Sequence, residues 1–453
     1  VNSGLLRQGD GNLVLSNTGV NLNTGTWEMQ AGRSLTLSSS LENRAALMLG
    51  GGSLIGSGSL VNGTQGMVSG SGRIATGFNN QGALVVDAGL TQIDQSFVNR
   101  GQILLGGNSA TLSGGHIDNQ GLIQGVGRIN NNIANTGAAG VIEAQGGTLT
   151  LAGQIVGANG GILAAGSGAK LLFSQGLARN AGQIQLAGGT FDNNGKALVN
   201  EASGSLSGYG HVRSGAFTNQ GRVLLSGGTS AVYADVLGSN ASQIILSGNS
   251  NTTFYGKVDI QSGAELRVSN GSVATFFELV QQRSGAKFTG SGAKRFEGGL
   301  SVGASPGLGT DEGDVEFGES NTYLAEIGGP AACTLACGSN DAVKNGSFDK
   351  YAVLGQLSFG GTLTLTSWNG FVAQAGQHFD LFDWGSTTGS FASIDASGFK
   401  LAAGTQLDTS ALYTTGEISV TAVPEPAHWA LMLAGLAVLG WRVRRQPTGQ
   451  TKA

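Results

Sequence analysis

Apolar and polar residues alternate along most of this chain in runs of only three to five residues. The segments GALVVDAG at 82–89, GQILLGG at 101–107 and GRVLLSGG at 221–228 each place apolar residues two positions apart. Residues two apart share one face of a strand, so these runs predict short strands with one buried face. Gly-Gly or Ser-Gly pairs follow the runs and predict tight turns.

A five-residue motif recurs between these strands, as FNNQG at 78–82, FVNRG at 97–101, IDNQG at 117–121 and FTNQG at 217–221. A period of about 20 residues is the mark of a repeat protein. The motif's asparagine belongs to a longer series, with gaps of 16 to 24 residues, at Asn23, Asn43, Asn62, Asn80, Asn99, Asn119, Asn135, Asn159, Asn180, Asn200, Asn219 and Asn240.

The repeat length favours one architecture. A propeller blade needs about 40 residues, and the consensus of leucine-rich repeats is missing. A unit of about 20 residues cannot bury its own apolar face, so successive units must stack. We therefore predict an all-β fold, a single-chain parallel and right-handed β-helix over residues 1–300. Eleven steps of about 4.8 Å would make residues 23–240 a rod of roughly 50 Å.

The asparagine–glycine motif is expected at a corner of each coil. Glycine tolerates a positive φ, and asparagine tolerates it and bonds nearby backbone. Stacked corners would align the asparagine amides in a ladder, and the phenylalanine or isoleucine two residues earlier would point inward. The motif is thus interpreted as structural, and the clearest ladder members are Asn80, Asn99, Asn119, Asn180 and Asn219.

Past Asn240 the period loosens. Alternation continues at Val258 and Ile260, so strands are expected to about residue 300. The segment ATFFELVQQR at 274–283 fits either a helix or a strand.

Composition supports many short strands. Glycine supplies 80 of 453 residues, 40% of residues are hydrophobic, 11% are charged and the net charge is −4. Collagen and disorder are excluded by the irregular glycine spacing and the hydrophobic content. No basic surface for nucleic acid is expected.

The segment 301–422 carries a different set of motifs: SPG at 305–307, YLAEIGG at 323–329, DKYAVLG at 349–355, GGTLTLT at 360–366 and FDLFDWGSTTGSF at 379–391. Their order resembles the last part of the passenger region in autotransporter-like adhesins. The resemblance implies a C-terminal β cap that protects the open sheet edges of the solenoid.

The segment VPEPAHWALMLAGLAVLGWRVRRQ at 423–446 closely resembles the PEP-CTERM sorting signal of Gram-negative bacteria, also called an ice-binding protein C-terminal domain. The resemblance implies that an exosortase, a membrane protease-transpeptidase, recognises Pro424, Glu425 and Pro426. An apolar helix from about Trp429 to Trp441, with Gly435 and Gly440, is expected to cross the inner membrane. The stop-transfer arginines would be Arg442, Arg444 and Arg445, followed by a cytoplasmic tail at 447–453.

This orientation places residues 1–422 outside the inner membrane. The chain opens on VNSGLLRQ, so a fragment or a processed form without its signal peptide is expected. In an exported chain, Cys333 and Cys337 are expected to form a local disulfide, and two thiols are the alternative.

Candidate chemistry is sparse. Carboxylates of the repeat region fall at different phases of the repeat, and we predict no catalytic residue, cofactor or metal site. The acidic group at 311–319 (Asp311, Glu312, Asp314, Glu316 and Glu319) is expected in a solvated loop, with a weak calcium site as the alternative.

The predicted function is therefore an exported, non-enzymatic β-helix at the cell surface or in the extracellular matrix, an adhesin or biofilm scaffold. Exopolysaccharide or surface glycans are the expected partners besides the exosortase. The alternative is a β-helix lyase or hydrolase acting on polysaccharide. A minor alternative is ice binding, for which the TLTL segments at 148–151 and 362–366 are too isolated.

Overall fold

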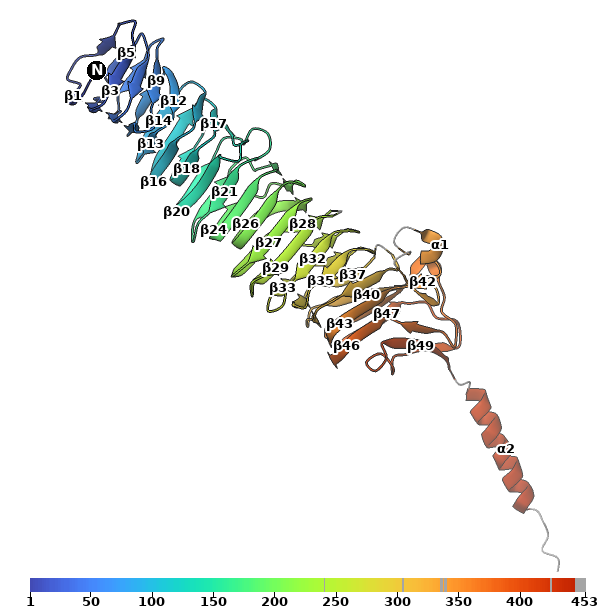
Figure 1. Ribbon diagram of the computed structural model, residues 1–453. Helices are drawn as coiled ribbons and strands as arrows, with labels where there is room; N and C mark the ends of the chain where they lie inside the picture. Colours follow the sequence, from blue (N-terminus) through green and yellow to red (C-terminus); the bar gives the residue numbers. More distant parts are fainter. Residues whose placement is uncertain (240, 304, 335–336, 338–339, 424–425, 445–453) are drawn as a thin grey trace, which may run out of the picture.

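The computed structural model describes residues 1–239, 241–303, 305–334, 337, 340–423 and 426–444. The chain winds as a parallel β-solenoid of about 15 turns and forms a long rod (Figure 1). Strands of successive coils pair in parallel, as Leu84 of β13 with Ile103 of β16. The predicted all-β parallel solenoid is confirmed, and its right-handed sense stays a prediction.

A sheet of seven described strands carries the repeated motif. Each strand except the last ends on an asparagine of the predicted series: β3 (Asn21–Asn23), β6 (Leu41–Asn43), β9 (Ser59–Asn62), β12 (Gly77–Asn80), β15 (Phe97–Asn99), β17 (Ile117–Asn119) and β19 (Ile133–Ala134). Equivalent residues pair from coil to coil, for example Asn80 with Asn99.

The other strands of the solenoid belong to one continuous sheet that turns around the rod. Its strands up to residue 173 are β1 (Leu5–Arg7), β2 (Leu13–Leu15), β4 (Thr26–Glu28), β5 (Ser34–Leu37), β7 (Ala46–Met48), β8 (Ser53–Ile55), β10 (Met67–Ser69), β11 (Gly72–Ile74), β13 (Ala83–Val86), β14 (Gly89–Ile93), β16 (Gln102–Gly114), β18 (Leu122–Ile129), β20 (Val141–Leu151), β21 (Ile162–Ala165) and β22 (Lys170–Phe173).

The same sheet continues to residue 302 with β23 (Arg179–Asn180), β24 (Gln183–Asp192), β25 (Leu198–Asn200), β26 (Ser205–Asn219), β27 (Arg222–Ser226), β28 (Thr229–Gly238), β29 (Gln243–Ser247), β30 (Asn251–Phe254), β31 (Val258–Ile260), β32 (Glu265–Val268), β33 (Val273–Phe276), β34 (Val280–Gln282), β35 (Lys287–Thr289), β36 (Ala293–Phe296) and β37 (Leu300–Val302). Residues 274–283 therefore lie in and between two strands and are not helical.

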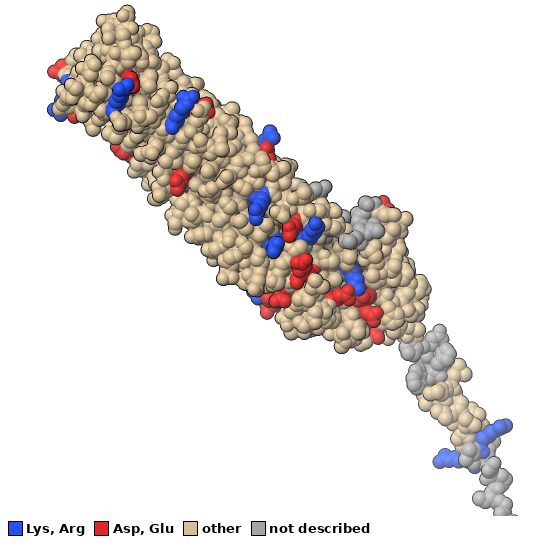
Figure 2. All heavy atoms as spheres, viewed as in Figure 1, with Lys and Arg blue, Asp and Glu red and all other residues tan. Residues whose placement is uncertain are grey.

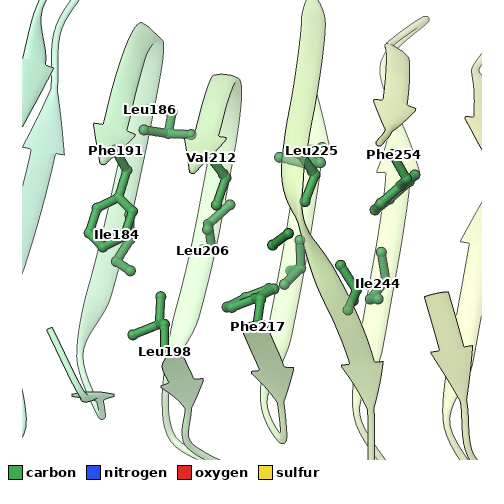
Figure 3. Close-up of a cluster of buried hydrophobic side chains, with 14 of the residues drawn as sticks. Ile184, Leu186, Phe191, Leu198, Leu206, Val212, Phe217, Leu225, Ile244 and Phe254 are labelled. Atoms are coloured by element: carbon green, nitrogen blue, oxygen red, sulfur yellow. The ribbon is translucent and has the colours of Figure 1, made fainter. Parts of the chain in front are cut away.

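The core is the inside of the rod. Because alternate residues of each short strand point inward, one or two apolar side chains of a strand stack on their equivalents in the next coil. Figure 3 shows side chains from successive strands pointing into this interior, among them Ile184, Leu206, Phe217 and Phe254. Phe254, Phe276 and Phe296 continue the stack with ring centroids 5.1 and 5.2 Å apart.

Parallel pairing continues beyond residue 300. The later strands of the large sheet are β38 (Leu308–Asp311), β39 (Val315–Phe317), β40 (Thr322–Ile327), β41 (Ala331–Ala332), β42 (Ser347–Phe348), β43 (Lys350–Phe359), β44 (Thr362–Ser367), β46 (Phe382–Gly389) and β47 (Ser393–Gly398). A separate antiparallel sheet, β45 (His378–Asp380), β49 (Glu417–Ala422) and β48 (Thr405–Asp408), lies at this end of the rod. Two short helical segments, α1 (Asp341–Lys344) and η2 (Trp368–Gly370), interrupt the strands.

The C-terminal helix α2 (Pro426–Arg444) extends away from the rod in Figure 1. Its apolar side chains are exposed, with Leu431 at 72% and Leu433 at 64%. Within the described residues, no helix is long and apolar enough to cross a membrane. The expected transmembrane helix is therefore not supported, because only the residues between His428 and Arg442 are apolar and a span needs about 20.

Candidate functional site

The repeated asparagines form one continuous chain of side-chain hydrogen bonds. In each link the Nδ2 of one asparagine donates to the Oδ1 of the asparagine in the next coil, at 2.7 to 2.9 Å. Over the described residues this ladder has twelve members: Asn2, Asn23, Asn43, Asn62, Asn80, Asn99, Asn119, Asn135, Asn159, Asn180, Asn200 and Asn219.

All five asparagines singled out from the sequence lie in this ladder, which we call the asparagine ladder. Asn2 extends it by one coil that the repeat analysis missed, and Asn240 lies outside the described residues. At the other end, Asn219 donates instead to the carbonyl oxygen of Gln243 at 3.0 Å.

The ladder amides from Asn23 onward are buried, and most of them use both hydrogens. Asn80, for example, donates to Asn99 Oδ1 at 2.7 Å and to the Gln102 carbonyl oxygen at 2.9 Å. Asn23 and each later member are fully buried. A buried amide without partners would destabilise the fold, so the pairing explains how the rod tolerates a polar row inside it.

In the repeated five-residue motif, the reason for the glycine two residues after the asparagine differs from the expected one. Neither the ladder asparagines nor Gly82, Gly101 and Gly121 have a positive φ. A Cβ on Gly101 would instead collide with the carbonyl oxygen of Gly82, and one on Gly121 with that of Gly101. The glycines are required because the backbones of successive coils approach closely at this corner.

Several carboxylates of the outer surface are paired with cations in adjacent coils. Asp94 accepts from Arg73, and this hydrogen bond lowers the pKa of the Asp94 carboxyl. Asp192 pairs with Lys170 and Asp259 with Arg283 in the same way. Figure 2 shows that charged side chains are few on the visible face and gather toward the end of the rod nearest α2.

The acidic group at 311–319 is a solvated loop only in part: Glu312, Asp314 and Glu319 are exposed outside the strands, whereas Asp311 and Glu316 lie in strands, contrary to expectation. Asp311 ends strand β38 with its side chain fully buried, and its Oδ1 lies 2.7 Å from Lys294 Nζ. Glu316 on β39 pairs with Arg295 at 2.8 Å. The described residues hold no group of three or more His, Cys, Asp or Glu arranged to bind a metal.

Burial makes Asp311 unusual electrostatically. Loss of solvent raises the pKa of its carboxyl to about 6, although Lys294 acts in the opposite direction. The backbone N–H of Gly313 also donates to Asp311 Oδ1, at 2.9 Å. The pair is thus a structural contact inside the core.

Asp349, the first residue of DKYAVLG, joins two of the other C-terminal motifs. Its carboxylate accepts from the backbone N–H of Gly307 at 2.6 Å and of Glu326 at 2.7 Å. Burial raises the pKa of the Asp349 carboxyl well above its usual range. The motif residues therefore hold the turn at Gly307 against strand β40.

The two cysteines form a disulfide. Cys333 and Cys337 are both buried, with Cα atoms 5.8 Å apart. The bridge closes a loop of four residue steps beside α1. A loop this short constrains the unfolded chain only slightly.

The residues of the expected sorting signal lie at the end of the described chain. Pro424, Glu425, Arg445 and the tail at 447–453 are outside the described residues. Pro426, Trp429, Gly435, Gly440, Trp441, Arg442 and Arg444 belong to α2.

Sequence analysis missed a row of outward-facing aromatic residues. Tyr233, Tyr255 and Phe277 occupy equivalent positions in successive coils, with ring centroids 4.6 and 5.4 Å apart and planes within 4°. The guanidinium carbon of Arg213 lies 4.5 Å from the Tyr233 ring centroid. We call these four residues the aromatic column. Its signal in the sequence is a spacing of 22 residues between the three rings.

No protein-family model and no curated protein matches this chain. Its function must therefore be argued from the geometry of the rod.

Proposed function

We propose that this protein is an exported, non-enzymatic rod that acts as an adhesin or scaffold at the cell surface or in the extracellular matrix. The observation that carries the proposal is the asparagine ladder, which is buried and internally satisfied. The residues that recur in every coil therefore stabilise the stacking of coils. A protein whose repetition serves length and stiffness suits a mechanical or display role.

The outer surface supports this proposal. General acid–base chemistry needs a carboxyl or similar group free to exchange a proton with a bound substrate. Asp94, Asp192 and Asp259 instead hold an arginine or lysine of an adjacent coil. A solenoid also suits an enzyme that acts on polysaccharide, but no observation on the described residues favours that function.

The C-terminal segment supplies the proposed route to the surface. Its resemblance to the PEP-CTERM signal leads us to propose that an exosortase at the inner membrane recognises Pro424, Glu425 and Pro426. The solenoid would then be exported, with its rod presented to the outside. The apolar side chains of α2, such as Leu431 and Leu436, are exposed. In this proposal the membrane or the exosortase shields them from water.

The test is to locate the protein in cells with and without the exosortase. In wild-type cells we expect the rod at the surface or in the matrix, and in the deletion strain we expect it in the inner-membrane fraction. Alanine substitution of Pro424, Glu425 and Pro426 should reproduce the deletion. The matched control replaces three residues beyond the arginines, Gln446, Pro447 and Thr448, and should leave the location unchanged. An identical distribution in both strains rules the sorting proposal out.

A further inference from the structure

Two rings of the aromatic column, Tyr233 and Tyr255, line a hollow on the outer surface of the rod. The hollow has a volume of about 340 Å³ and is lined by Tyr233, Tyr255 and Asp235, with a floor of Ser214, Gly215, Ala234 and Gly256. This volume lies in the range of small-ligand sites, about 300–1,000 Å³. Because the floor residues are small, they do not cover the edges of the two tyrosine rings, which stay accessible to a ligand.

The column is more exposed than large aromatic residues usually are. Tyr255 is 43% exposed and Phe277 48% exposed, in a molecule whose other phenylalanines mostly fill the core. In the described part of the chain, no protein atom makes a hydrogen bond with the hydroxyl of Tyr233 or Tyr255, and Arg213 forms no ion pair. Exposed aromatic rows with unused donors are characteristic of binding surfaces.

The stacking geometry determines which ligand chemistry fits. The planes of Tyr233 and Tyr255 are within 1° of parallel, so the rings cover each other's faces and present their edges to solvent. The edge of an aromatic ring carries the positive part of its quadrupole. Edges, tyrosine hydroxyls and the Arg213 guanidinium together favour a negatively charged oxygen ligand.

Charges around the hollow agree with this conclusion. Lys257 is exposed two residues after Tyr255, and within the described residues it forms no ion pair. Asp235 is the opposing charge, but its Oδ1 already accepts from the Lys257 backbone N–H at 2.9 Å. Asp235 keeps its negative charge, so an acidic ligand would place its carboxylates at Arg213, beside Tyr233, and away from Asp235.

The shape of the column favours a linear, hydroxyl-rich chain. Thr253 and Thr275 lie two residues before Tyr255 and Phe277, and so face the same side in equivalent positions. Three half-exposed rings offer much less than the roughly 800 Å² per partner that a stable protein interface needs. Single-stranded nucleic acid would require open ring faces for its bases, which this stack does not provide.

We propose that the aromatic column and its hollow bind an acidic polysaccharide, with the chain along the rod, carboxylate groups at Arg213 and hydroxyl groups on Tyr233, Tyr255 and the threonine row. This inference rests on the proposed function, because it names the ligand that a surface or matrix rod would hold.

The experiment measures binding of the full chain to polygalacturonate, with neutral dextran and dextran sulfate as the other probes. Calorimetry or biolayer interferometry is run at low and physiological salt. We expect binding to both acidic polymers and none to dextran. Arg213→Gln should weaken binding by about tenfold, because it removes a charge-assisted contact, and Tyr255→Ser by about three- to tenfold, because it removes a neutral hydrogen bond and ring contact.

Two matched variants keep the test specific. Arg222→Gln removes another exposed arginine without an ion pair among the described residues, and Tyr209→Ser removes an exposed tyrosine outside the column. Both should bind as the parent does. Circular dichroism of every variant must show the parent spectrum and melting temperature, and if Tyr255→Ser fails this criterion, Tyr255→Phe replaces it.

Several outcomes overturn the inference. These are unchanged binding in Arg213→Gln and Tyr255→Ser, equal losses in Arg222→Gln, equal affinity for dextran, and tighter binding of a single-stranded oligonucleotide than of polygalacturonate. Concentration-dependent dimerisation that the column variants abolish, without any glycan binding, would assign the surface to a second copy instead. Surface location without glycan binding rejects this inference alone, whereas glycan binding by a protein that stays in the cell rejects the proposed function alone.

Discussion

Lys294 Nζ lies 2.7 Å from Asp311 Oδ1, and neither side chain has any exposed surface. The two residues belong to β36 and β38, in the coils where the solenoid passes into its C-terminal region. Each charge is stable inside the core only because the other compensates it. The cost of losing one partner should therefore exceed the cost of losing both.

Lys294→Met should strongly destabilise the rod. It leaves the Asp311 carboxylate buried without its cation, which costs about 3–5 kcal/mol. The double variant Lys294→Met/Asp311→Leu should recover most of that loss, because no buried charge remains. Urea unfolding followed by circular dichroism measures both. Lys287→Met, at an exposed site on the adjacent strand, is the control. A double variant less stable than Lys294→Met would contradict the explanation.

The stability of the parent relative to Asp311→Asn should fall as pH rises from about 4 to about 6. The pKa of Asp311 is raised to about 6 in the folded protein, and the unfolded value is about 3.9. Between these values the folded state holds more protons, so stability decreases with rising pH. Two pKa units correspond to about 3 kcal/mol.

The comparison with Asp311→Asn is needed because other carboxyl groups also change the stability with pH, some raising it and some lowering it as pH rises. The pKa of Asp349 is also raised, whereas that of Asp94 is lowered. Their contributions are common to both proteins and cancel in the difference. Unfolding free energies at four pH values between 4 and 7 test the prediction, which fails if the difference does not change with pH.

Asn119→Ala should cost about 2–4 kcal/mol. The change leaves Asn99 Nδ2 and Asn135 Oδ1 without their partners in the ladder, and each unsatisfied buried group costs about 1–3 kcal/mol. Asn2→Ala removes a single link at the partly buried first coil and should cost much less. Thermal and urea unfolding measure both. Equal effects at the two positions would show that the ladder does not stabilise the fold.

Gly101→Ala should destabilise the protein although the φ of Gly101 is not positive. The new Cβ meets the Gly82 carbonyl oxygen, so two coils must move apart, at a cost of about 1–3 kcal/mol. The control is Gly137→Ala, where a Cβ has no atom within 4 Å. This second variant should unfold at the same urea concentration as the parent. If the two variants unfold at the same urea concentration, the close approach of the coils does not contribute to stability and the prediction is wrong.

The fold could be predicted from the sequence because its signals repeat. A strand run and an asparagine recur every 16 to 24 residues, and stacking equivalent positions gives both the parallel sheets and the ladder. The role of the glycine in the repeated motif was assigned wrongly, since a glycine that avoids a neighbouring coil and one that adopts a positive φ look the same in sequence.

Contacts that occur only once could not be predicted. The pairing of Lys294 with Asp311 depends on the register between coils of unequal length, and no pattern of charges marks it. The aromatic column could be found in the sequence only with a repeat period of 22 residues from Tyr233 onward. The earlier coils average closer to 20 residues. The expected membrane-spanning helix failed for a simpler reason, because His428 and Arg442 shorten its apolar stretch.

All links of the asparagine ladder point the same way, from Asn2 toward Asn219. If one amide were rotated by half a turn, it would set two NH₂ groups against each other on one side and two oxygens on the other. An isolated reversal is therefore penalised at both neighbours, and a concerted reversal would also lose the bonds from Nδ2 to carbonyl oxygens that most members make. The asparagine side chains therefore form one directional array. The amide orientation in each coil is set by the amide of the coil before it.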